Sequence, residues 1–251
     1  SGLMTRYKKR VPDVEHIMSC MISEGIIQDR AEIINDHIAF RTFGVPHLGI
    51  QSLSKIFLAY GYTQRDFYRF DTKKLNAYWF SPPKDPPNLP RIFISECCVD
   101  ELSQESQTII HRYTDTVTQD PVDALDLSDG ASVDEFLHTP LWKTPTWEDY
   151  STLLQESEYA AWVLYNRYYL NHFTITVQPL PDGYNTIELF NSFLERIGVK
   201  LNSAGGKVKR SADGLLIQSS TVAQQQTTLF PHKDGITRNH DIAGSYVEFA
   251  E

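Results

Sequence analysis

The sequence has no long apolar run and few cysteines, and each shortage excludes a class of protein. None of its 251 residues belongs to an uninterrupted apolar segment of the roughly 18 to 20 residues that a membrane-spanning helix needs. Its three cysteines, Cys20, Cys97 and Cys98, have no spacing that suits a disulfide framework or a tetrahedral zinc site. We therefore expect a protein without a membrane span, whose cysteines are reduced thiols.

Basic residues are also scarce, with 23 Lys and Arg against 32 Asp and Glu and a formal net charge of -9. Residues 100–160 hold 14 acids and 2 bases, a balance of -12, so the excess negative charge belongs to one segment. A nucleic-acid binder needs a clustered basic face to neutralise phosphates. We expect no nucleic-acid partner and, with 41% hydrophobic residues, an ordinary globular protein.

The first residues predict a cytoplasmic location. Ser1-Gly2-Leu3 looks like a cloning remnant ahead of Met4, and no charged-then-apolar signal peptide follows.

Helical and strand patterns occur in the same order in the two halves of the chain. Residues 14–27 have helical apolar spacing, and the first half then reads strand, helix and three strands, over residues 37–43, 50–60, 62–70, 75–80 and 91–97. The second half repeats this order with a strand, a helix and two further strands, over residues 171–177, 186–197, 215–220 and 246–249, while residues 221–230 are ambiguous. The pattern predicts an α+β fold of two βαβββ modules from an internal duplication.

The acidic segment between the two copies has helical character at residues 133–137 and 147–169. Its tryptophans and tyrosines are too apolar for a wholly solvated insertion, so we expect it to cover the strands as a helical subdomain or lid. The predicted organisation is a helical segment at 1–30, a first module at 31–99, the insertion at 100–170 and a second module at 171–251, in one compact domain.

The strand that opens each copy has a histidine on one face and apolar side chains on the other, since alternate strand residues face the same way. The histidine faces hold His37, Ala39 and Arg41 in the first copy and His172, Thr174 and Thr176 in the second. Equivalent strands of a duplicated sheet lie near its pseudo-twofold axis, so the two histidines are expected to converge. Taken alone, each is more often an ordinary hydrogen-bonded residue.

A carboxylate would complete a metal site, because two imidazoles alone hold a divalent metal poorly. Glu248 lies between large apolar residues in the final strand, an unfavourable place for an unpaired charge. Two histidines and one carboxylate with open positions are the arrangement of non-heme Fe(II) oxygenases. Arg41 shares the face of His37, where its guanidinium could bind the carboxylate of a metal-bound acid.

Four segments resemble the DUF1338 family, now associated with 2-oxoadipate dioxygenase/decarboxylase. They are Asn35–Thr42, Asn171–Thr174, Ile217–Ala223 and Gly244–Phe249, and the resemblance spans nearly the whole chain. It implies a vicinal-oxygen-chelate fold, similar in plan to hydroxyphenylpyruvate dioxygenase, whose two modules form a half-open barrel with an inserted helical segment.

The resemblance also implies a function and a set of site residues. His37, His172 and Glu248 match the family's metal ligands, and Arg41 matches its substrate-carboxylate arginine. The implied enzyme is an Fe(II)-dependent dioxygenase that converts 2-oxoadipate and dioxygen to 2-hydroxyglutarate and carbon dioxide, with a place in lysine catabolism. Gln218 and Ser220, on one strand face, are further candidates for substrate contacts.

Two other functions remain compatible with these residues. The first is a glyoxalase-like isomerase, lyase or hydrolase that uses the metal as a Lewis acid without redox chemistry. The second is a metal-independent module in which the duplicated sheet binds a small ligand. Activity without oxygen would favour the first, and ligand binding that survives chelation would favour the second.

Overall fold

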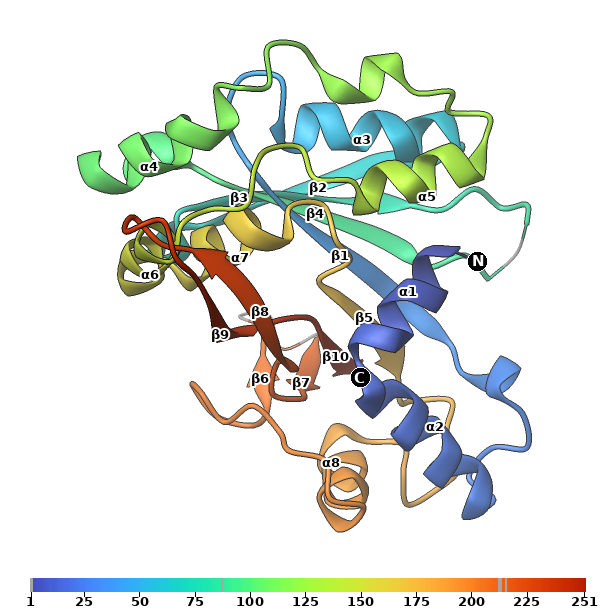
Figure 1. The fold of residues 1–251 in the computed structure, drawn as a ribbon. Coiled ribbons are helices and arrows are strands. Elements are labelled where there is room, and N and C mark those ends of the chain that lie inside the picture. The colour runs from blue at the N-terminus through green and yellow to red at the C-terminus, as the bar shows by residue number, and fades with distance from the viewer. Residues whose placement is uncertain (1, 87, 212–213, 215) are drawn as a thin grey trace.

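The computed structural model describes residues 2–86, 88–211, 214 and 216–251, and shows an α+β protein built around one curled, half-barrel sheet (Figure 1). The strands of this sheet are β1 (Asn35–Phe43), β2 (Thr63–Phe70), β3 (Leu75–Ser81), β4 (Arg91–Cys97), β5 (His172–Thr176), β6 (Lys209–Arg210), β7 (Ile217–Ser220) and β10 (Tyr246–Ala250). Their order across the sheet is β2-β3-β4-β1-β5-β10-β7-β6.

The strand order confirms the predicted duplication. At the centre of the sheet, β1 and β5 pair in antiparallel fashion. Each central strand also has a parallel neighbour, which is β4 for β1 and β10 for β5. The order β4-β3-β2 on one side of the centre is thus repeated as β10-β7-β6 on the other, as expected of two βαβββ modules related by a pseudo-twofold axis.

One helix from each module covers the same face of the sheet. The helix α3 (Gly49–Ala59) packs on β1, where the Phe57 and Phe40 ring centroids are 5.3 Å apart. Its counterpart α8 (Ile187–Arg196) packs on β10, with the Phe190 and Phe249 centroids 5.1 Å apart. The alternate strand residues therefore point to the opposite, concave face.

The acidic insertion forms four helices, α4 (Gln104–Thr114), α5 (Gly130–His138), α6 (Trp147–Glu156) and α7 (Glu158–Asn166). Helix α7 lies on the concave side of the sheet, where the Tyr159 hydroxyl is 2.8 Å from Ser95 Oγ of β4. The Trp162 indole on the same helix donates to the Gly244 carbonyl at 2.9 Å. These two aromatic side chains of the insertion are therefore buried against the strands. Helix α4, which the sequence pattern did not predict, begins at a serine cap, Ser103.

Two helices precede the sheet, α1 (Gly2–Arg10) and α2 (Pro12–Ser23). The sequence predicted the second but extended it to residue 27; the chain leaves the helix before Gly25, whose φ is +70°. The first lies within the helical segment predicted at 1–30, although helical apolar spacing begins only at residue 14. It is anchored by buried Tyr7, whose hydroxyl donates to the Tyr246 carbonyl and accepts from the Phe173 amide.

The ambiguous segment after β7 forms a separate hairpin of β8 (Gln225–Pro231) and β9 (Thr237–Ala243). Phe230 is fully buried against Tyr150 and Tyr165 of the inserted helices, with ring centroids 5.2 and 4.9 Å away. The Gln and Thr residues of this segment alternate between exposed and half-buried positions without a buried apolar face, which explains the weak strand signal. Leu215, the first residue of the strand predicted at 215–220, lies outside the described residues.

No helix in the described part of the chain is both long and apolar enough to cross a membrane. The three cysteines are free thiols, and Cys97 and Cys98 are buried.

Candidate metal centre

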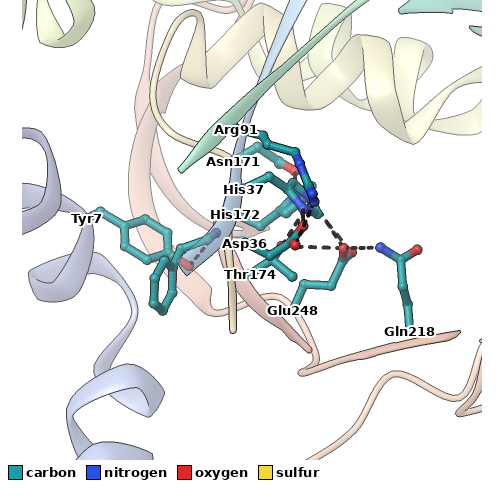
Figure 2. Close-up of polar contacts among 10 residues, drawn as sticks. Tyr7, Asp36, His37, Arg91, Asn171, His172, Thr174, Gln218 and Glu248 are labelled. Carbon is teal, nitrogen blue, oxygen red and sulfur yellow. Dashed lines mark hydrogen bonds and ion pairs between the residues drawn. The ribbon is translucent and has the colours of Figure 1, made fainter. Parts of the chain in front are cut away.

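Three side chains from three adjacent strands converge on the concave face of the sheet (Figure 2). They are His37 of β1, His172 of β5 and Glu248 of β10, and one potential ligand atom from each lies within 4.8 Å of the others. His37 Nε2 is 3.5 Å from one carboxylate oxygen of Glu248, and His172 Nε2 is 3.9 Å from the other. Among the described residues, no other group of three His, Cys, Asp or Glu side chains has such geometry.

The residue before each histidine fixes the orientation of its imidazole. Asp36 Oδ2 lies 2.8 Å from His37 Nδ1, and Asn171 Oδ1 lies 2.8 Å from His172 Nδ1. An oxygen acceptor at Nδ1 selects the tautomer with the proton on that nitrogen, which leaves the Nε2 lone pair free for a metal. This pair of dipeptides, an Asp or Asn followed by His, is visible in the sequence, but the sequence reasoning did not use it.

The electrostatics of the three groups suit a bound cation. Burial, with smaller contributions from His37 and Arg41, holds the pKa of His172 well below its ordinary value and keeps the ring neutral. Burial raises the pKa of Glu248, although His37 opposes this shift. A buried carboxylate is unfavourable without a compensating positive charge. Two imidazole nitrogens and one carboxylate therefore fit a divalent metal, and these donor types do not by themselves select one metal.

Hydrogen bonds hold the carboxylate and its neighbours in place. Gln218 Nε2 of β7 donates to Glu248 Oε1 at 2.7 Å, approaching from the side opposite the histidines (Figure 2). Thr174 Oγ1 lies 3.1 Å from His37 Nε2 and donates to Glu248 Oε1 at 3.5 Å. Ser220 is buried directly opposite Glu248 in the β7–β10 register. Gln218 thus contacts the candidate ligand Glu248 itself, a contact that the sequence analysis did not predict.

Arg41 lies on the same concave face as His37, and its Nη1 is buried with no hydrogen-bond partner among the described residues. Its guanidinium carbon lies over the rings of Tyr159 and Trp162, at 4.9 and 5.3 Å from their centroids. A buried guanidinium nitrogen without an acceptor is a natural site for a ligand carboxylate.

Tyr246 was missed by the sequence reasoning and forms part of the site. Its ring stacks on His172, with centroids 4.8 Å apart and planes inclined by 21°. Burial raises the pKa of Tyr246, which keeps the phenol protonated, while nearby Arg41 has the opposite, smaller effect. Its position two residues before Glu248, on the same strand face, was the available signal.

Comparison with known proteins identifies relatives over the whole chain. A family model described as 2-oxoadipate dioxygenase/decarboxylase matches residues 1–251. A rice (Oryza sativa subsp. japonica) protein named 2-oxoadipate dioxygenase/decarboxylase, chloroplastic/amyloplastic, is 45% identical over 100% of this chain and 67% of its own length. An Arabidopsis thaliana protein named 2-oxoadipate dioxygenase/decarboxylase, chloroplastic, is 41% identical over 98% of this chain and 65% of its own. The chain thus spans about two thirds of the length of these relatives.

Solved structures agree with this relationship. The hydroxyglutarate synthase from Oryza sativa, crystallised with 2-oxoadipate, superposes with a TM-score of 0.84 at 44% identity and covers 100% of this chain and 78% of that chain. A glyoxalase superfamily protein from Ralstonia eutropha has a TM-score of 0.80 at 22% identity, covering 99% of this chain and 79% of that chain, and shows that the fold is shared. The expected vicinal-oxygen-chelate architecture is confirmed.

The relatives contradict the predicted cytoplasmic location, because both plant proteins are named as chloroplastic. The prediction was wrong because it relied on the first residues of this sequence, which are no guide to targeting when the relatives are longer than this chain.

Proposed function

The chain belongs to the 2-oxoadipate dioxygenase/decarboxylase family, and we propose that it is an Fe(II)-dependent enzyme that converts 2-oxoadipate and dioxygen to 2-hydroxyglutarate and carbon dioxide. The observation that supports this most directly is the convergence of His37, His172 and Glu248 on the concave face, next to an arginine with an unpaired nitrogen. The names of the relatives and the 2-oxoadipate bound to the rice protein support the choice of substrate.

His37, His172 and Glu248 would hold the iron, although another divalent metal can occupy such a site in a purified protein. The metal would supply a Lewis acid for the 2-oxo acid and the electrons that activate dioxygen. Three protein ligands leave coordination positions open for both reactants. Asp36 and Asn171 keep both imidazoles in the tautomer that can bind it, so the site is organised before the metal arrives.

Arg41 would bind a substrate carboxylate through its unpaired Nη1. Ser220, beside Glu248, remains a candidate polar contact for the substrate. Gln218 is a candidate for the same role, and its amide nitrogen also donates to Glu248. Tyr246, whose burial-raised pKa keeps it protonated, can donate a hydrogen bond within the site.

The overall reaction balances without another reductant. The substrate loses its carboxylate next to the ketone as carbon dioxide, and both atoms of dioxygen enter the five-carbon product. One becomes part of the new carboxylate, and the other becomes the hydroxyl group. The protein's own contribution is therefore to position the two reactants and to leave coordination positions on the metal open for them.

The test is oxygen consumption by protein loaded anaerobically with Fe(II) and mixed with 2-oxoadipate. We expect oxygen uptake coupled to carbon dioxide release, and loss of both in His37→Ala, which removes one ligand. The matched control is His111→Ala on α4, whose side chain is 41% exposed and pairs with Asp115, and this variant should retain activity. No oxygen uptake by protein with verified iron content, across a panel of 2-oxo acids, would refute the proposal.

A further inference from the structure

We propose that Tyr159 and Trp162 form an aromatic seat that positions Arg41 for the substrate, so that the acidic insertion contributes directly to substrate affinity. This inference depends on the proposed function, because it concerns how the substrate-binding arginine is held. It assigns a role to helix α7 that the metal centre alone does not require.

The seat consists of two ring faces supplied by one helix. The Arg41 guanidinium carbon lies 4.9 Å from the Tyr159 centroid and 5.3 Å from the Trp162 centroid, both within the range of cation–π attraction. The two residues are three positions apart on α7 and therefore face the same way. Both rings are more than nine-tenths buried, so water does little to screen the attraction.

Arg41 has no carboxylate partner among the described residues, so the two aromatic rings are its main source of electrostatic stabilisation. Among the described residues, no ion pair joins Arg41 to an Asp or Glu, and its Nη1 has no acceptor. An acidic partner would stabilise the guanidinium but would also occupy the fork that a substrate carboxylate needs. Aromatic faces attract the charge without supplying a carboxylate acceptor, so the unpaired Nη1 stays available to a ligand. The arrangement stabilises a buried cation without neutralising it.

The rings themselves are held firmly. The Tyr159 hydroxyl is 2.8 Å from Ser95 Oγ, and Ser95 lies directly opposite Arg41 in the β1–β4 register. The Trp162 indole is fixed by its hydrogen bond to the Gly244 carbonyl, two residues before β10 begins. Seat and arginine are thus both tied to the sheet that bears the metal ligands. A rigid seat reduces the conformational entropy that Arg41 loses when substrate binds.

The experiment weakens the ring faces without changing their shape. Phenylalanines carrying one, two and three fluorines are introduced at position 159 and compared with Tyr159→Phe, since fluorine withdraws the electron density that attracts a cation. Binding of 2-oxoadipate to Fe(II)-loaded protein is measured by calorimetry without oxygen, so that no turnover occurs. We expect the dissociation constant to rise stepwise, by about 3- to 30-fold across the series, from the magnitude of desolvated cation–π attraction. The metal dissociation constant should stay unchanged.

The same series in an Arg41→Ala background separates positioning from simple structural support. If the seat acts through Arg41, fluorination there should leave 2-oxoadipate affinity unchanged, because the cation is gone. Trp162→Phe, which keeps a smaller ring face, provides a second measurement with Trp147→Phe as its control, since Trp147 stacks on His240 instead. We expect weaker substrate binding only in the first.

Three results would overturn the proposal. A flat series with intact Arg41, while Arg41→Ala itself weakens binding, would refute the seat but leave the proposed function standing. An equal dependence in both backgrounds would show that the ring does not act through Arg41. If the loaded wild-type protein does not bind 2-oxoadipate at all, the substrate assignment fails, and the seat proposal fails with it.

Discussion

Replacing Asp36 with asparagine should weaken metal binding without removing a ligand. Asp36 accepts from His37 Nδ1 through one carboxylate oxygen and from Arg91 through the other, both at 2.8 Å. An asparagine has only one oxygen, so its NH2 group must face either the His37 N–H or the Arg91 guanidinium, and donor would then face donor. The change therefore removes the negative charge behind His37 and sets the amide against one of its neighbours.

The expected size of the effect depends on which way the new amide turns. If its oxygen stays on His37, the tautomer is preserved and the ligand becomes less basic, a loss of about 10-fold in metal affinity or about 1.4 kcal/mol. If its NH2 turns to His37, the imidazole proton moves to Nε2 and faces the metal, and the loss approaches about 100-fold. The Asp36 side chain is only 22% exposed, so solvent replaces the lost interaction poorly.

The assay is an anaerobic competition titration with a chromogenic chelator, using Fe(II) and Co(II) in parallel. The matched control is Asp66→Asn on β2, an exposed carboxylate that accepts from Trp79 at 2.9 Å and touches no candidate ligand. We expect the control to match the wild type. A dissociation constant for Asp36→Asn within about twofold of wild type would refute the argument that Asp36 sets the state of His37.

Three further predictions concern the hydrogen bond to Glu248, stability in acid and the stabilisation of the apo-protein by metal. Gln218→Leu deletes the 2.7 Å hydrogen bond to Glu248 and should weaken metal affinity about 10-fold or more, as measured by the same titration; unchanged affinity would contradict this. Burial acts to raise the pKa of Glu156, but hydrogen bonds from Ser103 and Ser106 outweigh it and hold the pKa at about 2. Because the folded pKa is depressed, this stabilisation is present above the ordinary value of 4.5 and is lost as the pH falls toward 2, so Glu156→Gln should flatten acid unfolding in that window. An unchanged acid transition would count against it. Adding metal at 100 times its dissociation constant should stabilise the apo-protein by about 2.7 kcal/mol in chemical denaturation, and no gain would argue against a site confined to the folded state.

Local patterns in the sequence were sufficient to predict most of the sheet. Residues alternate along the strand that contains His37, which separates a polar face from an apolar one. This separation does not depend on which elements pack against the two faces. The repeated strand–helix–strand order then predicted that this strand lies close to its counterpart, and the structure shows β1 and β5 paired, in antiparallel fashion. The structure brings His37, His172 and Glu248 together, while their role as metal ligands stays a prediction.

Two elements have weak or misleading local signals in the sequence. Helix α1 has a basic end typical of a solvated face, yet it is anchored through the single buried side chain of Tyr7. The β8–β9 hairpin is rich in exposed polar residues and is anchored by buried Phe230 and Ile242. In both cases, packing against distant parts of the chain outweighs local propensity.

The sequence by itself determined the order of the elements, the face to which each strand residue points and the family, because periodicity and motifs are properties of neighbouring residues. Tertiary structure decided that helix α7 lies across the concave face and that Tyr159, more than a hundred positions away in the chain, lies against Arg41. It also decided that Gln218 restrains Glu248. These contacts depend on how separate segments pack, and no local period encodes the distance between them.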